Sequence, residues 1–194
     1  YKKSAITLQV IGGLIMILIF LNIKEMYHLI PKDYRGGIWV VFMIGLGKFY
    51  DVVLGNNNSI IVNTKYYRTV LLLGVFTVVL MIVLNMIFIP IYGIEGSAFA
   101  TLITIAIYNT IKLFFVVKKM NLFPFTIKTL HSLGILIVLF LLFYFWDFSF
   151  HPIVNIFFKS TLITTLYVWV NYKLKISEDF NNVVDATLQE IRKR

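Results

Sequence analysis

The stretch that decides the fold is "LNMIFIPIYGIEGSAFATLITIAIYNTIK", residues 84–112. It belongs to a long apolar run that is interrupted by Pro90 and Gly93, two residue types that break helices and favour turns. On each side of the interruption the apolar run is long enough for a helix of about 20 residues, the length that crosses a bilayer. The pattern predicts two antiparallel membrane helices joined by a tight extracellular turn.

The composition of the whole chain agrees with membrane-spanning helices. Hydrophobic residues make up 59% of the chain and charged residues only 14%, against about 45–50% and about 25% in soluble domains. The net charge of +9 comes from basic residues scattered between apolar spans, which favours membrane topology over nucleic-acid binding. The sequence contains no cysteine, which excludes disulfides and thiolate metal sites.

Six segments are apolar enough to span a membrane, which predicts an all-α polytopic membrane protein. The connections are short except for the polar loop 24–37, so consecutive helices should be antiparallel neighbours. The six predicted transmembrane helices are 4–23, 38–63, 69–90, 94–117, 127–147 and 152–172.

Basic residues predict the orientation of these spans. Twelve Lys and Arg residues fall on the side that holds both chain ends, and three, Lys24, Lys32 and Arg35, fall on the other. The positive-inside rule therefore places both ends in the cytoplasm. The chain opens on "YKKSAITLQ", residues 1–9, which is typical of the middle of a protein. We therefore expect a C-terminal part of a longer chain.

The closing segment, 173–194, has a different character. Ser177 is a candidate N-cap, and Glu178 and Asp179 would favour the positive end of a helix dipole. Apolar residues recur behind them at helical spacing, which predicts a short amphipathic helix at the cytoplasmic surface. The alternative is a partly frayed tail.

Polar residues interrupt the second predicted span at "GKFYDVVLGNNNS", residues 47–59. Lys48 and Asp51 lie near the middle of that span, with Asp51 roughly 18 Å from its cytoplasmic end, and each would cost about 2.5–3.5 kcal/mol against lipid. Their spacing of three residues would allow them to pair. On a continuous helix, one side carries a polar stripe that consists of Lys48, Asp51, Gly55, Asn58 and Ser59. Asn57 points to the opposite side of that helix.

Two interpretations of this stripe are open. It could be a structural ion pair that holds the helix against a neighbour, or the wall of a cavity for a polar substrate. We favour the cavity, with Lys48 as the cation for an anionic group such as a phosphate and Asp51 setting its orientation and charge.

Other polar and small residues favour packing over chemistry. Gly96, Ala100 and Thr104 recur every four residues, a spacing that lets helix backbones approach closely in lipid. Asn85 and Asn109 are expected to make interhelical hydrogen bonds. Lys112 and Lys159 lie nearer to helix ends, where a lysine can extend its ammonium to the interface.

One polar residue on the first span and the three histidines remain. Gln9, with Gly12 and Gly13, marks either a cavity lining or a bend. The three histidines have no paired carboxylate at ligand spacing, so no metal site is expected. Because no phosphate-binding loop, nucleophile elbow or carboxylate pair occurs either, we expect no enzymatic activity.

Residues 66–104, "YYRTVLLLGVFTVVLMIVLNMIFIPIYGIEGSAFATLIT", resemble the C-terminal part of polysaccharide flippases of the multidrug/oligosaccharidyl-lipid/polysaccharide exporter superfamily. Residues 46–68 and 172–181 resemble the same proteins, so the similarity covers nearly the whole chain. Ser97 stands where the family often has Ala. The matching positions are Asn85, Pro90, Tyr92, Gly93, Ile94, Gly96, Ala98, Ala100, Thr101 and Thr104.

The resemblance implies two six-helix bundles around a central cavity, with two further C-terminal helices. Residues 1–120 would then be four helices of the second bundle, 121–172 the additional pair and 173–194 a cytoplasmic tail. The implied activity is the movement of undecaprenyl-pyrophosphate-linked oligosaccharide across the bacterial cytoplasmic membrane by alternating access. No cofactor is implied beyond a coupling ion, Na⁺ or H⁺.

The implied partners are the lipid-linked oligosaccharide, membrane lipid and the N-terminal bundle of the same chain. Two alternatives are a multidrug exporter of the same superfamily and a structural membrane subunit without transport of its own. A cavity for cationic drugs should be rich in acidic and aromatic groups, whereas Lys48 beside Asp51 balances the charge. This balance favours the flippase.

Overall fold

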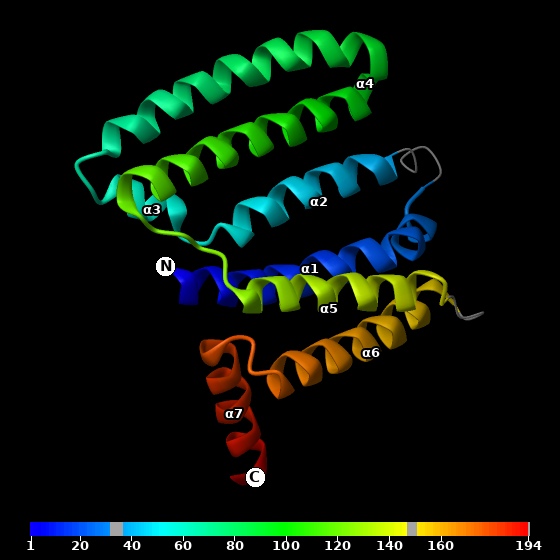
Figure 1. Cartoon of the computed structure of the whole chain (residues 1–194). Helices are drawn as coiled ribbons and strands as arrows, with labels where there is room; N and C mark the ends of the chain where they lie inside the picture. Colours follow the sequence, from blue (N-terminus) through cyan, green and yellow to red (C-terminus); the bar gives the residue numbers. More distant parts are fainter. Residues whose placement is uncertain (32–36, 147–150, 194) are drawn as a thin grey trace. The chain divides into compact units, whose positions relative to one another are not determined.

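The computed structural model describes residues 1–31, 37–146 and 151–193. Lys32, Arg35 and the end of the predicted span 127–147 lie outside these ranges. Every regular element in them is a helix, and Figure 1 shows their course. The helices are α1 (Lys2–Leu29), α2 (Ile38–Val53), α3 (Asn57–Val62), α4 (Tyr67–Met120), α5 (Ile127–Tyr144), α6 (Pro152–Lys173) and α7 (Glu178–Lys193).

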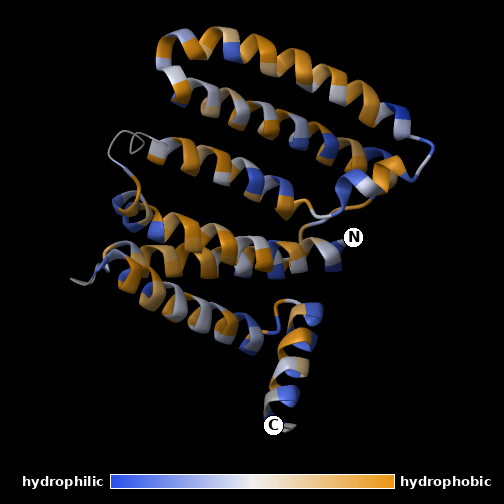
Figure 2. Cartoon of the chain, turned by 180° about the vertical axis from the view of Figure 1, so that it is seen from behind, coloured by the Kyte–Doolittle hydropathy of each residue, from blue (hydrophilic) through white to orange (hydrophobic). Residues whose placement is uncertain are grey.

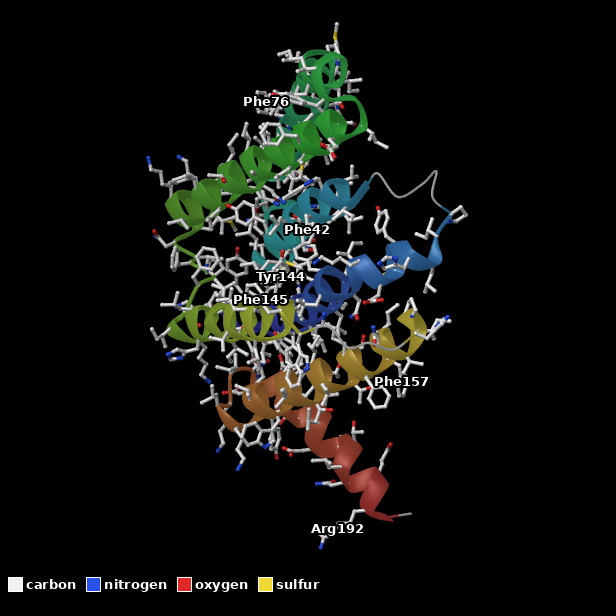
Figure 3. All side chains as sticks on the ribbon, turned by 90° about the vertical axis from the view of Figure 1, so that its right-hand side faces the viewer. Phe42, Phe76, Tyr144, Phe145, Phe157 and Arg192 are labelled. Atoms are coloured by element: carbon white, nitrogen blue, oxygen red, sulfur yellow. The ribbon has the colours of Figure 1, made fainter. Side chains whose placement is uncertain are left out.

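Four of the described helices, α1, α4, α5 and α6, are long and apolar enough to cross a membrane. Apolar residues dominate along them in Figure 2. Large apolar side chains such as Phe76 and Phe157 project outward from their helices and are exposed (Figure 3). An apolar exterior with an all-helical backbone suits lipid, where each backbone polar group must be bonded internally. The chain therefore has the fold of an all-α membrane protein.

The helical class is confirmed, but six separate spans are not. The predicted helices 69–90 and 94–117 are joined into α4, and the predicted helix 38–63 is divided between α2 and α3. The prediction of one continuous helix there is wrong. The break follows from Gly55, which has φ of 61°, a left-handed conformation that glycine adopts without steric cost. The three asparagines after it are weak helix formers, which disfavours a continuous helix further.

The helix α4 reverses its direction at Gly93, where φ is 57° and ψ is −131°. Two arms result, residues 67–92 and 94–120, which lie side by side in Figure 1. A Cβ atom on Gly96 would lie 2.1 Å from the backbone oxygen of Phe88, so the two arms touch through backbone at this point. Just beyond, the rings of Phe88 and Phe99 meet edge to face at 5.0 Å.

The helices form two compact groups within the chain. One group consists of α2, α3 and α4, and the other consists of α1, α5, α6 and α7. The resemblance grouped residues 4–23 with the three predicted spans that follow, whereas the contacts place α1 against α5 and α6. The predicted boundary at residue 120, between the second bundle and the two additional helices, concerns the whole protein and stays a prediction.

Buried polar contacts join the helices of the second group. The Gln9 amide donates to the carbonyl of Thr129 at 3.0 Å, and the Tyr167 hydroxyl donates to the carbonyl of Val10 at 2.9 Å. A Cβ on Gly13 would lie 2.6 Å from Leu136 and 3.1 Å from the Tyr167 hydroxyl. Gln9 and Gly13 therefore serve helix packing. Lys159 is only 4% exposed, so the prediction that it reaches the interface is wrong.

The helix α7 is tied to the end of this group where α1 and α5 begin and α6 ends (Figure 1). The Ser177 hydroxyl accepts from the amide of Phe180 at 3.3 Å and meets the Thr7 hydroxyl at 2.8 Å. Lys3 pairs with Glu178 at 3.1 Å and with Asp179 at 3.3 Å. The predicted N-cap and the predicted helix are confirmed, and the cytoplasmic position stays a prediction.

Substituting Gly96→Ala should disrupt the reversal of α4, because the added methyl would meet the Phe88 carbonyl, which is backbone and cannot turn away. Overpacking of this kind costs about 1–3 kcal/mol, sometimes more. We expect a lower thermal midpoint and a smaller monodisperse fraction in detergent. Gly74→Ala is the matched control, because nothing lies within 4 Å of a Cβ at Gly74. Equal midpoints for the two variants would contradict the close approach of the arms.

Candidate functional site

The polar stripe of residues 47–59 is divided by the break between α2 and α3. Lys48 and Asp51 are exposed on α2, and Asn58 and Ser59 are exposed on α3, while Gly55 lies in the connection. Asn57 is 1% exposed. Its burial agrees with the prediction that it points away from the polar side. The role of that side as a cavity wall stays a prediction.

Asp51 pairs with a different lysine from the one predicted. Its carboxylate Oδ1 lies 3.8 Å from Nζ of Lys112, on the second arm of α4. The pairing that the spacing would allow between Lys48 and Asp51 is not formed among the described residues. The prediction that Lys112 extends to the interface is wrong, because Lys112 is only 3% exposed. The Lys112 side chain is buried between packed helices and does not extend along its helix to the interface.

The buried ammonium of Lys112 has two compensating neighbours. The first is the Asp51 carboxylate, but 3.8 Å is too long for a hydrogen bond, so charge alone holds this pair. The second is the ring of Tyr108, whose centroid lies 4.2 Å from Nζ. A cation over an aromatic face gains about 0.5–2 kcal/mol. Because the contact with Asp51 is too long for a hydrogen bond, Asp51 leaves the three N–H donors of the Lys112 ammonium unused.

Hydrogen bonds link this arm of α4 to α2 and α3. The Tyr108 hydroxyl donates to the Asn58 side-chain oxygen at 3.5 Å, and the Tyr50 and Thr110 hydroxyls meet at 3.1 Å. The cluster thus draws Asp51 from α2, Asn58 from α3 and both Tyr108 and Lys112 from α4. We call these four residues the Lys112 cluster.

Two buried amides in the same group of helices are unsatisfied. Asn57 on α3 and Asn109 on α4 are 1% and 0% exposed. Within the described residues neither side chain has a hydrogen-bond partner for its oxygen or its nitrogen. The interhelical bond predicted for Asn109 is thus not formed in this part of the chain. An unpaired buried amide costs free energy, so this group of helices has unused hydrogen-bonding capacity in addition to the buried charge of Lys112.

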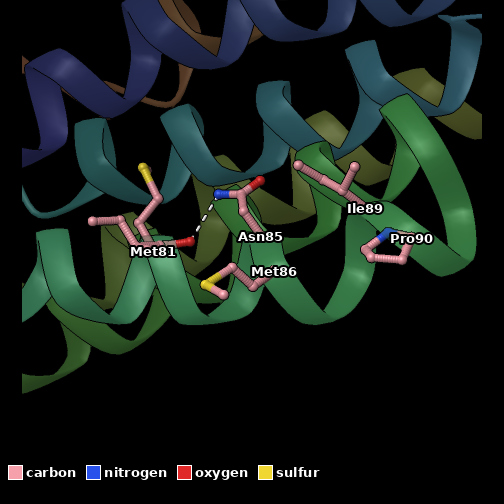
Figure 4. Close-up of a pocket in the computed structure, with 6 residues that line it drawn as sticks. Met81, Asn85, Met86, Ile89 and Pro90 are labelled. Carbon is pink, nitrogen blue, oxygen red and sulfur yellow. Dashed lines mark hydrogen bonds between the residues drawn. The ribbon is translucent and has the colours of Figure 1, made fainter.

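The other residues predicted from the sequence to be important are not members of the Lys112 cluster. On the first arm of α4, Asn85 donates to the Met81 carbonyl at 2.8 Å instead of bonding to another helix. It lines an apolar pocket of about 570 Å³ together with Pro90 (Figure 4). On the second arm Gly96, Ala100 and Thr104 are all buried.

The sequence contains a signal for the burial of Lys112. Continuing the four-residue spacing of Gly96, Ala100 and Thr104 leads through Tyr108 to Lys112 and Val116. Thr104, Lys112 and Val116 are buried in the structure. Lys112 lies eight residues before the end of α4 at Met120, a depth of about 12 Å along the axis. A helix face that is buried at its small residues is also buried at the positions that continue the same four-residue spacing.

No family model, no curated protein and no solved structure compared with this chain matches it. The class of the protein therefore rests on its own features. These are the apolar helices α1, α4, α5 and α6 and a lysine buried between helices. They define an α-helical membrane protein that carries an ion pair within its helices.

The two members of this ion pair should respond differently to substitution. Asp51→Asn leaves the ammonium of Lys112 buried without a counter-charge, and we expect it to cost about 1–2 kcal/mol. Lys112→Met removes the buried charge at similar volume and leaves Asp51, whose side chain is 53% exposed, free to be hydrated. We expect the thermal midpoint in detergent to fall clearly for Asp51→Asn and little for Lys112→Met.

The exposed Lys48 provides the control, and Lys48→Met should leave the midpoint nearly unchanged. The double variant Asp51→Asn/Lys112→Met should recover most of the stability lost in Asp51→Asn, because the uncompensated charge is gone. A larger loss in Lys112→Met than in Asp51→Asn would show that the ammonium itself stabilises the fold.

Proposed function

We propose that this chain is the C-terminal part of a flippase that moves an anionic, lipid-linked oligosaccharide across the bacterial cytoplasmic membrane. The observation that carries the proposal is the buried ammonium of Lys112, whose counter-ion Asp51 lies 3.8 Å away. Charged groups inside membrane helices are costly and mark substrate or ion pathways. The resemblance of residues 66–104 to polysaccharide flippases supports a lipid-linked oligosaccharide as the cargo.

The Lys112 cluster offers chemistry that suits a phosphate group. An ammonium presents three donors as a compact positive charge, and a phosphate oxygen could bond to it more strongly than the carboxylate at 3.8 Å does. Asp51 is half exposed, so its carboxylate has room to move aside while the phosphate binds. In this proposal Lys112 takes the role first expected for Lys48, and Lys48 supplies a second positive charge on the exposed side of α2.

A multidrug exporter is the second candidate, and one observation favours it. The carboxylate of Asp51 is far more exposed than the ammonium of Lys112, at 53% against 4%, and Tyr50 and Tyr108 lie in the same group of helices. An accessible carboxylate beside aromatic rings suits an organic cation. The two candidates differ in which member of the pair is essential: Lys112 for an anionic cargo and Asp51 for a cationic one.

Transport by the full-length protein tests the proposal. In liposomes with a fluorescent, pyrophosphate-linked oligosaccharide, Lys112→Ala should lower the initial rate at least tenfold, since one charge-assisted hydrogen bond contributes about 1.5–3 kcal/mol. Lys112→Arg should retain part of the rate because it keeps the positive charge. Lys48→Ala should also reduce transport, although less.

The control is Lys119→Ala, which removes an exposed lysine from the last turn of α4. All variants must show equal amounts of folded protein in the membrane. Normal transport by Lys112→Ala would overturn the role of the cluster in flipping. Loss of drug efflux in Asp51→Asn, with no oligosaccharide transport by the parent protein, would establish the multidrug exporter instead.

A further inference from the structure

We propose that a basic pocket at the end of the helix group α1, α5, α6 and α7 binds the phosphate of an anionic phospholipid headgroup. The pocket has a volume of about 210 Å³. It lies where α1 and α5 begin and where α6 passes into α7 (Figure 1). It belongs to the group without the Lys112 cluster, so the proposal does not depend on the cargo of the transporter.

The charges around the pocket favour an anion. Lys2 and Lys3 from the start of α1 and Lys128 from the first turn of α5 contribute three ammonium groups. Among the described residues that line the pocket, Glu178 is the one acidic residue, and it pairs with Lys3, as does Asp179 beside it. Two of the three lysines, Lys2 and Lys128, therefore remain outside these ion pairs, and the lining keeps a net positive charge.

The backbone adds to this preference. The helices α1 and α5 both start at the pocket, and the N-terminal end of a helix carries a partial positive charge of about half a unit. The cap residue of α5, Thr126, lines the pocket directly. Lys128 is held in place because its ammonium donates to the carbonyl of Lys175 at 2.8 Å. That contact leaves it further donors for an anion.

The inner wall of the pocket indicates a lipid instead of a free phosphate. It includes Ile6 and Ile176, which are 6% and 2% exposed. The pocket therefore combines lysines at its rim with apolar residues at its base, at the ends of apolar helices that are long enough to span the bilayer. A phospholipid presents the same sequence of chemistry, from phosphate to acyl chain, at this level of a membrane. Basic pockets between membrane helices at the interface are typical sites for acidic headgroups.

The orientation of α7 agrees with a position of the pocket at the membrane surface. Its axis runs across those of α1, α5 and α6 in Figures 1 and 2, as expected for a helix that lies along the membrane surface. Val183 and Leu188 are 66% and 53% exposed on α7, so they could enter the headgroup region when the helix is bound to lipid. The contacts of Lys3 with Glu178 and Asp179 would then hold α7 beside the bound headgroup.

Lipid binding to the purified full-length protein tests the proposal. Phosphatidylglycerol is titrated against the protein in detergent and bound lipid is counted by native mass spectrometry, with phosphatidylcholine as the uncharged reference. The variant Lys2→Gln/Lys128→Gln should bind phosphatidylglycerol about thirtyfold more weakly and phosphatidylcholine unchanged. The matched control Lys118→Gln/Lys119→Gln removes two exposed lysines from the end of α4 and should bind both lipids as the parent protein does.

A variant with the opposite effect guards against simple misfolding. Glu178→Gln removes the acidic group from the lining and should strengthen binding of phosphatidylglycerol about fivefold, while Asp179 still holds Lys3. Equal phosphatidylglycerol affinity in the parent and Lys2→Gln/Lys128→Gln, or weaker binding in Glu178→Gln, would overturn the site. Soluble glycerol 3-phosphate should bind much more weakly than the lipid, and equal binding would overturn the lipid assignment. Transport is not measured, so a failure of the flippase proposal would leave these outcomes unaffected.

Discussion

The close approach of Gly96 to the carbonyl of Phe88 is the contact on which the first group of helices depends. Gly93 supplies the left-handed φ at the reversal, and Gly96 supplies the absence of a side chain that allows the two arms of α4 to touch. Because the second arm returns at this point, it can pack against α2 and α3. Tyr108 and Lys112 reach Asp51 and Asn58 only through that return.

The ion pair that results is incompletely compensated. Removing a lysine from water costs several kcal/mol, and a carboxylate at 3.8 Å recovers only part of that cost. A purely structural pair would be expected to close to hydrogen-bond distance, as Lys3 and Glu178 do at 3.1 Å on the surface. The amides of Asn57 and Asn109, which have no hydrogen-bond partner within the described residues, add to the unmet polar interactions of this group.

The second group of helices shows the contrasting case. There three buried side chains donate to a neighbouring helix: Gln9 to Thr129, Asn22 to Ser160 and Tyr167 to Val10. Each contact fixes one helix against the next, and each adds about 1 kcal/mol or less in a membrane. This group is suited to be a static support, with its charged residues concentrated at the end where α7 is attached. The Lys112 cluster and the basic pocket beside α7 thus lie in different groups of helices.

The sequence by itself determined the helical class, the turn at Pro90 and Gly93, and the start of α7 at Ser177. These depend on neighbouring residues, since apolar runs in lipid must satisfy their own backbone hydrogen bonds. For the site, the sequence identified Asp51 and Asn58 but assigned the wrong lysine to Asp51. The break at Gly55 also went undetected, because a glycine inside an apolar run is compatible with a continuous helix until its φ is known. Only the tertiary structure decided that Lys112 is buried and faces Asp51, because this contact requires α4 to fold back and bring together residues that lie 61 positions apart in the sequence.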